Sequence, residues 1–214
     1  MFQVRIHGRG GQGVVTGAEM LSVAAFLGGR HAQAFPSFGS ERTGAPVVAF
    51  CRLDDREIRL REPVMQPDAL LIQDPTLLHQ VDVFSGLNKD GFILINTTRT
   101  FEQLGLGEFA KGFKPAHLLT VPATELAMKH VGRPVPNVPM LGAFAALGGL
   151  VWALATGHAP LAVARWGVAT GSVYAMTDDL PDAAQPAVCA MIERLTATQW
   201  ASVPQDPKTS KHQS

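Results

Sequence analysis

Apolar and polar positions along the first 131 residues follow two different periods. Short segments that alternate apolar and polar residues, or that are apolar throughout, predict strands, whereas longer apolar segments with helix-forming residues predict helices. This pattern gives expected strands at residues 2–6, 31–35, 69–73, 92–96 and 118–121, and expected helices at residues 14–27 and 122–131.

Two further segments carry local signals of a turn or a cap. Residues 47–53 and 57–60 both alternate, and the intervening Asp54 and Asp55 favour a turn, so this stretch predicts a β-hairpin. Asp74 and Pro75 follow the third expected strand. Asp is a favoured N-cap residue and Pro is tolerated in the first turn, so a helix is expected to begin there and to reach Leu87.

Strands that alternate with helices across short turns predict an α/β fold. We expect a doubly wound, mostly parallel sheet with one inserted hairpin, followed by a helical C-terminal part at residues 140–156, 160–175 and 183–197. Because a sheet of this kind needs helices to cover it, residues 1–200 are predicted to form a single domain. The polar residues 201–214 are predicted to be a disordered tail.

The segment 138–156 is almost uncharged and nearly reaches the length of about 20 apolar residues that spans a bilayer. It is also rich in small residues, such as Gly142, Ala146 and Gly149, and no basic cluster flanks one side. Small residues let a second backbone approach closely. We therefore expect a buried or subunit-facing helix, and a membrane helix is the alternative.

The composition narrows the range of functions. Charged residues make up 17% of the chain, against about 25% in an average protein, so part of the surface is expected to lie against a partner. The 18 basic and 18 acidic residues balance, which argues against nucleic-acid binding. No secretory signal is seen, and a cytoplasmic location is expected. Cys51 and Cys189 are too few for a usual iron–sulfur cluster and are expected to be buried.

A glycine loop after the first expected strand is the first candidate site. Gly8, Gly10 and Gly13 form a G-x-G-x-x-G pattern that opens a helix, as in dinucleotide-binding folds, and Arg9, Gly11 and Gln12 complete the loop. The loop therefore either meets an anion or serves as a tight turn that packs helix on sheet. Dinucleotide binding also needs an acidic residue about 20 positions further on. Residues 29–34 contain none, which weakens a nicotinamide-binding interpretation.

The second candidate site is residues 36–46, which follow the second expected strand. Ser37, Ser40 and Arg42 could bind a phosphate or carboxylate there, whereas a local or intersubunit pair of Glu41 with Arg42 is the structural alternative. No nucleophile, base and oxyanion hole occur together elsewhere in the chain, and His7 is expected to be structural. The chain alone indicates a scaffold with a ligand crevice.

Four ordered blocks resemble the gamma subunit of the 2-oxoacid:acceptor oxidoreductase family, of which pyruvate synthase is an example. They are HGRGGQGVVT at residues 7–16, AQAFPSFGSERTGAPV at 32–47, QDPTLL at 73–78, and GRPVPN at 132–137 with MLGAF at 140–144. The last block adds Asn137 to the candidate anion or interface residues. The part after Leu150 resembles the family less.

The resemblance implies a subunit of an enzyme that oxidatively decarboxylates a 2-oxoacid to an acyl-CoA. It places thiamine diphosphate in alpha and beta partners and [4Fe-4S] clusters in a ferredoxin-like partner and, in some members, in the thiamine-binding chain. This chain would then be structural or lie near CoA, without a catalytic or metal-binding residue. A free NAD(P)-dependent oxidoreductase is the main alternative, and a membrane-attached accessory protein is a third possibility.

Overall fold

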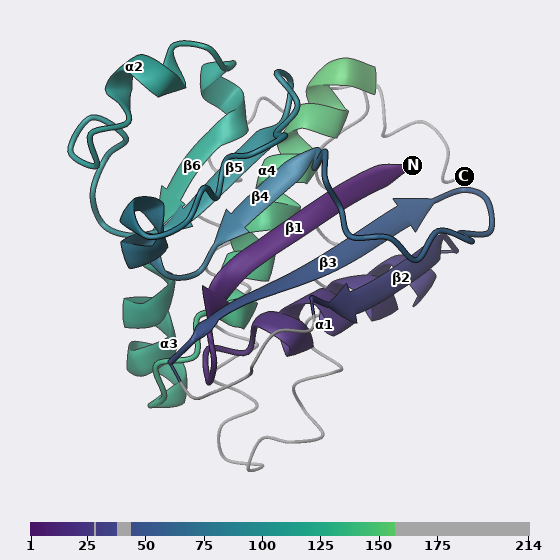
Figure 1. Cartoon of the computed structure of the whole chain (residues 1–214), viewed down its shortest axis with the longest axis horizontal. Coiled ribbons are helices and arrows are strands. Elements are labelled where there is room, and N and C mark those ends of the chain that lie inside the picture. Colours follow the sequence, from purple (N-terminus) through teal and green to yellow (C-terminus); the bar gives the residue numbers. More distant parts are fainter. Residues whose placement is uncertain (28, 38–43, 157–214) are drawn as a thin grey trace, which may run out of the picture.

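Six strands form one mixed sheet in the computed structural model, which describes residues 1–27, 29–37 and 44–156. The strands lie in the order β2-β3-β1-β4-β5-β6 (Figure 1). β1, β4, β5 and β6 are parallel neighbours, whereas β3 pairs antiparallel with both β1 and β2. Their bounds are Phe2–Arg9 for β1, His31–Pro36 for β2, Pro46–Asp54 for β3, Ala69–Ile72 for β4, Phe92–Asn96 for β5 and Leu118–Val121 for β6.

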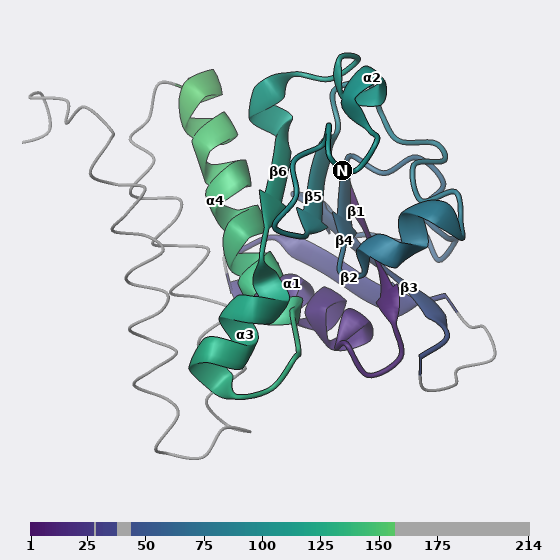
Figure 2. The same cartoon turned by 90° about the vertical axis from the view of Figure 1, so that its left-hand side faces the viewer.

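Helices and short helical turns cover both faces of the sheet. Figure 2 shows α1, α3 and α4 on one side of the strands and α2 on the other. The chain therefore crosses from strand to strand on both faces, as a doubly wound fold does. The bounds are Val14–Leu27 for α1, Pro75–His79 for the 3-10 turn η1, Gly107–Ala110 for α2, Pro115–His117 for η2, Ala123–Val131 for α3 and Asn137–Thr156 for α4.

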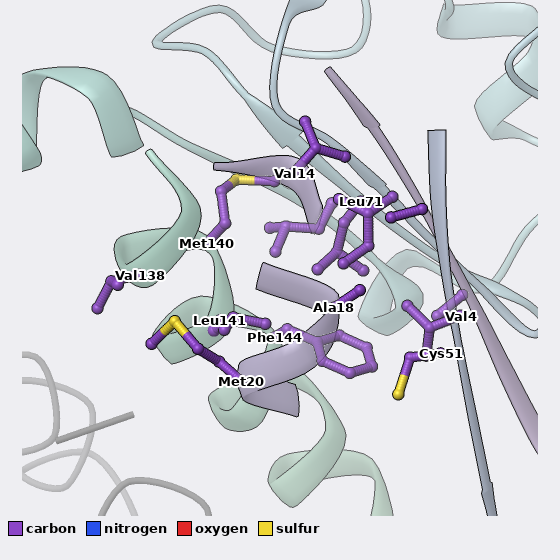
Figure 3. Packing of buried hydrophobic residues seen from close by; sticks show 14 of the residues in the cluster. Val4, Val14, Ala18, Met20, Cys51, Leu71, Val138, Met140, Leu141 and Phe144 are labelled. Carbon is purple, nitrogen blue, oxygen red and sulfur yellow. The ribbon is translucent and has the colours of Figure 1, made fainter. Parts of the chain in front are cut away.

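The larger core lies between the sheet and helices α1 and α4. Figure 3 shows Ala18 of α1 and Phe144 of α4 directed toward the strands, whereas Met20 of α1 is directed toward Leu141 of α4. Val4, an inward residue of β1, is fully buried in this cluster. Burial against the sheet thus explains the apolar residues on the inward side of α1 and in the first part of α4.

The opposite face has a smaller apolar cluster, which includes Ile72 and Ile93 from the strands and Leu77 from η1. Beside it, β1 and β3 present two buried arginines. Arg5 donates hydrogen bonds to the main-chain oxygens of Val64, Val83 and Ser85, and Arg52 donates to that of Glu62. Since buried charges need polar partners, these contacts hold the loops at 55–67 and 80–87 over the sheet.

Most expected elements are present, and the α/β, doubly wound class is confirmed. The predicted hairpin is wrong in its second arm. Residues 57–60 form no strand, and β3 pairs instead with β2, where Phe35 lies opposite Phe50. The sheet is consequently mixed, with three parallel and two antiparallel pairings.

The predicted helix from Asp74 to Leu87 is also corrected. Asp74 is the N-cap and its side chain accepts from the Thr76 amide, as expected, but the regular part ends at His79 as a 3-10 turn. Turns and bends follow up to Gly86, whose backbone lies close against the carbonyl oxygen of Met65.

Among the described residues, no helix meets the length and hydropathy that a membrane span requires. The buried side chains at the start of α4, including Met140 and Leu141, face the sheet and α1. The expected helices at 160–175 and 183–197, the tail at 201–214 and Cys189 lie outside the described residues. The single domain over residues 1–200 stays a prediction.

Candidate functional site

The glycine loop lies at the carboxyl end of β1, where the sheet changes its direction of winding. From β1 the chain passes through α1 to β2 on one side, whereas β4 and β5 lie on the other side. In open α/β sheets such a switch point is the usual place of a ligand crevice. Residues 73 and 74 at the end of β4 reach the same edge, because the amide of Gln73 donates to the carbonyl of His7 at 2.7 Å.

The Arg9 side chain is held by residues from two separate segments of the chain, Gly44 and residues 74–80. Its Nε donates to Oδ2 of Asp74 at 3.1 Å, and its Nη1 donates to the carbonyl of Gly44 at 3.0 Å. Its Nη2 donates to Oγ1 of Thr76 at 2.8 Å and to Oε1 of Gln80 at 2.7 Å. The guanidinium group thus places four hydrogen bonds within the chain, out of the five that it can donate.

Gln12 closes the loop onto the same carboxylate. Its Oε1 accepts from the amide of Arg9 at 2.8 Å, and its Nε2 donates to Oδ2 of Asp74 at 2.9 Å. Burial acts to raise the pKa of Asp74, but hydrogen bonds from Thr76 and Gln12 and the charge of Arg9 outweigh it, so the pKa is lowered. Asp74 is therefore ionised at neutral pH and neutralises Arg9.

Gly13 and Asn137 bring the start of α1 against the start of α4. A Cβ atom at Gly13 would lie 2.5 Å from Nδ2 of Asn137, and the φ of Gly13 is +71°. Both the contact and the left-handed backbone require glycine at this position. Asn137 is 6% exposed, so this predicted candidate packs beneath the loop and does not project into solvent.

Other buried amides line the same edge of the sheet. Nδ2 of Asn96 donates to the carbonyl of Gln73 at 2.8 Å and to Oγ1 of Thr124 at 2.7 Å. Gln73 is 2% exposed, and its Oε1 has no hydrogen-bond partner among the described residues. The carboxyl ends of β4 and β5 are thus joined through the neutral side chain of Asn96.

The second candidate loop is only partly described. Ser37 is exposed, and its amide donates to the carbonyl of Val48, which continues the β2–β3 ladder. At the other end, the amides of Gly10 and Gly44 bond to the carbonyls of Ala45 and Gly10, respectively. The second end of this loop, at Gly44 and Ala45, therefore meets the glycine loop, whereas the first end at Ser37 stays on β3. Ser40, Glu41 and Arg42 lie outside the described residues.

His7 is buried on β1, 6% exposed, and neither ring nitrogen has a hydrogen-bond partner among the described residues. Burial and, to a lesser degree, the charge of Arg5 lower its pKa to about 4. The folded chain thus keeps His7 neutral under conditions in which an unfolded chain binds a proton.

This difference predicts acid destabilisation. Below the ordinary histidine pKa, His7 binds a proton in the unfolded chain. In the folded chain it binds that proton only near its lowered pKa of about 4. The free energy of unfolding should therefore fall by about 3 kcal/mol from above pH 6.5 to pH 4, since one pKa unit corresponds to about 1.4 kcal/mol. Chemical denaturation at several pH values measures it. A His7→Leu variant that keeps the full acid dependence would contradict the assignment.

Sequence reasoning missed Asp74, Thr76 and Gln80 as parts of this site. Asp74 was expected to cap a helix, but nothing local links it to a loop some 65 positions earlier. The available signal was the QDPTLL block at residues 73–78, which contains both Asp74 and Thr76. Arg9 and Gln12 were candidates for an anion or subunit-interface site, and within the chain their side chains contact Asp74.

The strand order argues against the dinucleotide-binding alternative. In that fold the second strand is a direct neighbour of the first, so that an acid at its end reaches the ribose. Here β3 lies between β1 and β2, and the residue that follows β2 is Ser37. The part of the chain that the structure describes also contains no group of three or more potential metal ligands.

Comparisons with known proteins agree on one family. The profile described as pyruvate ferredoxin/flavodoxin oxidoreductase matches residues 3–159. A pyruvate synthase subunit, PorC, of Methanosarcina barkeri is 54% identical over 145 residues, which cover 68% of this chain and 76% of that protein. The common subunit gamma of the pyruvate/ketoisovalerate oxidoreductases of Thermococcus litoralis is 48% identical over 151 residues, covering 71% and 80%.

Solved structures show the same fold. The pyruvate oxidoreductase subunit PORC of Thermotoga maritima superposes with a TM-score of 0.62 at 33% identity, covering 90% of this chain and 93% of that one. A 2-oxoglutarate:ferredoxin oxidoreductase from Magnetococcus marinus has a TM-score of 0.63 over 96% of this chain and 32% of its own. Its identity is 14%, so it supports the fold alone.

Proposed function

The chain belongs to the pyruvate ferredoxin/flavodoxin oxidoreductase family, as its resemblance to gamma subunits predicted, and from this premise we propose that it serves a 2-oxoacid oxidoreductase as a non-catalytic subunit. The enzyme would convert a 2-oxoacid and CoA to an acyl-CoA and CO2, and pass the two electrons to an acceptor such as ferredoxin. The observation that carries this proposal is the match over 3–159, which includes both loops of the candidate site.

The cofactors are assigned to partner subunits. Thiamine diphosphate would supply the carbanion chemistry in the alpha and beta subunits, and [4Fe-4S] clusters in a ferredoxin-like partner would carry the electrons. Cys51 does not fit a cluster ligand, because it is buried and its pKa is raised to about 12 by that burial, whereas a ligand must be a thiolate. A cytoplasmic location is part of the same proposal.

We assign the contact of this chain with CoA to the second loop. Arg9 already places four of its five guanidinium hydrogen bonds within the chain, and Gln12 bonds Asp74, so these side chains keep little donor capacity for a phosphate. Ser37 is exposed at the same edge of the sheet, and Ser40, Glu41 and Arg42 follow it in the sequence. The glycine loop would instead support this edge or meet the neighbouring subunit.

Replacing Arg42 by Ala tests this assignment. The KM for CoA should rise about tenfold, as expected from the loss of one charge-assisted hydrogen bond to a phosphate, while the KM for the 2-oxoacid stays the same. Steady-state reduction of a viologen dye by the assembled enzyme measures both constants. An unchanged KM for CoA in an intact assembly would remove the CoA contact and leave an interface role.

The substrate is tested by comparing pyruvate, a branched-chain 2-oxoacid and an aryl 2-oxoacid with the same assembly. CoA-dependent dye reduction with at least one of them is expected. NAD(P) reduction by the isolated chain without partners would instead support a free nicotinamide enzyme.

A further inference from the structure

Arg9 and Asp74 form the best connected polar pair of the described residues. The Arg9 side chain is 23% exposed and that of Asp74 12%, and their contact at 3.1 Å joins the end of β1 to the end of β4. Around this pair, Gln12 bonds the same carboxylate and the Gly44 carbonyl accepts from Nη1 of Arg9. One ion pair therefore touches the glycine loop, the end of the second signature and the start of η1.

The two carboxylate oxygens of Asp74 accept hydrogen bonds from different partners. Oδ1 of Asp74 accepts from the amide and hydroxyl of Thr76, which caps η1. Oδ2 accepts from Nε of Arg9 and from Nε2 of Gln12. The division matters because an asparagine can keep the cap through its carbonyl oxygen, but its NH2 group cannot accept from Arg9 or Gln12.

The other end of the guanidinium acts on the second signature. Nη1 of Arg9 binds the Gly44 carbonyl at 3.0 Å, beside two main-chain bonds, from Gly10 to Ala45 at 3.0 Å and from Gly44 to Gly10 at 3.3 Å. Since the last bond is long, the side chain of Arg9 is a substantial part of what fixes Gly44 against the glycine loop.

We propose that Arg9 and Asp74 are positioning residues of the oxidoreductase: their ion pair sets the place at which the second signature returns to the sheet at Gly44, and Arg9 does not itself bind the anionic substrate. The kinetic part of this proposal rests on the proposed function. The structural part, which concerns the Gly10 and Gly44 amides, does not.

Three variants separate this role from direct anion binding. Arg9→Gln removes the positive charge and most of the N–H donors of the guanidinium group. Asp74→Asn keeps the cap of η1 but removes the oxygen that accepts from Nε of Arg9. Arg9→Lys keeps the charge, but a single ammonium group cannot reach Asp74 and the Gly44 carbonyl with the geometry of the planar fork. Arg59→Gln is the matched control, because Arg59 makes an exposed ion pair with Glu57, away from the loop.

The first readout is hydrogen exchange of the Gly10 and Gly44 amides in the full chain within its complex. We expect exchange to accelerate about tenfold in Arg9→Gln, in Arg9→Lys and in Asp74→Asn, as local opening becomes easier, and to stay unchanged in Arg59→Gln. Unchanged exchange in all three site variants would overturn the structural part, whatever the enzyme proves to catalyse.

The second readout is the split between KM and kcat in the assembled enzyme. We expect the KM for CoA to rise about tenfold in Arg9→Gln and in Asp74→Asn, with no further rise in the double variant and with kcat within about twofold, because both changes break one shared contact. A KM for CoA that is lower or unchanged in Asp74→Asn would overturn the proposal. So would a wild-type KM for CoA in Arg9→Lys, because it would show that Arg9 acts by its charge on the anion. If the wild-type assembly does not use CoA, the proposed function fails while the exchange result stands.

Discussion

Gly86→Ala should destabilise the chain by about 4 kcal/mol or more, the range of a substitution with a specific structural cause. A Cβ atom at this position would lie 2.0 Å from the main-chain oxygen of Met65, and the φ of Gly86 is +70°. The neighbouring carbonyls of Val64 and Ser85 are both bonded by Arg5, so neither loop can withdraw without loss of a buried hydrogen bond. Chemical denaturation of the purified chain measures the effect.

Gly105→Ala is the matched control. Gly105 has a φ of +77°, but an added Cβ would meet no atom within 4 Å. It should therefore cost only the backbone strain of a left-handed residue, about 1 to 2 kcal/mol. Equal losses in the two variants would show that strain alone acts at Gly86 and that the close passage over Met65 is not as described.

Leu94→Ala is the second substitution with a large expected effect, about 3 kcal/mol within the range of 2–5 for buried leucines. Leu94 is fully buried on β5, between β4 and β6, in the cluster that α1 and α4 cover. The cost combines the lost transfer free energy with the cavity that the surrounding helices cannot fill. The midpoint of thermal or denaturant unfolding should fall accordingly.

Leu60→Ala serves as its control. Leu60 is 47% exposed in the segment 57–60 that forms no strand, so its truncation should change the free energy of unfolding by no more than about 0.5 kcal/mol. A comparable loss in both variants would mean that residues 57–60 belong to a packed element, as the alternating pattern suggested.

The parallel part of the sheet was predictable from local patterns. β4 and β5 are short apolar segments buried on both faces, as expected of central parallel strands. The G-x-G-x-x-G pattern correctly indicated the turn between β1 and α1. The partner of β3 was not predictable in this way. Residues 57–60 alternate like a strand, yet β3 is paired on both sides already, with β1 and β2, so no sheet edge is left for them beside it. Pairing is decided by contacts that a local pattern does not contain.

The polar residues of β1 illustrate the same limit. Alternation correctly indicated a strand at residues 2–6, but it did not show that the polar Arg5 is buried beneath loops whose carbonyls it binds. At the candidate site, the glycine pattern located the turn. The carboxylate that stabilises this turn belongs to Asp74, which follows β4. Its ion pair with Arg9 depends on the pairing of β1 with β4, which the local sequence does not show.

The family of the chain and the ion pair that stabilises its glycine loop both favour a supporting subunit. A glycine loop whose arginine is neutralised by Asp74 is better suited to hold a surface in shape than to hold a free dinucleotide. The low charge of the chain, at 17%, agrees with a surface that is covered in an assembly. Both observations favour a subunit that supports catalysis by its partners.

The most direct test of this account is the cofactor content of the assembly that contains the chain. The full chain, purified with an affinity tag from its own cells without oxygen, should elute as a large brown complex, with thiamine diphosphate and iron in fixed ratio to the chain. The peak should reduce a viologen dye only when both a 2-oxoacid and CoA are present. A stable, colourless monomer without thiamine diphosphate or iron would contradict the central claim.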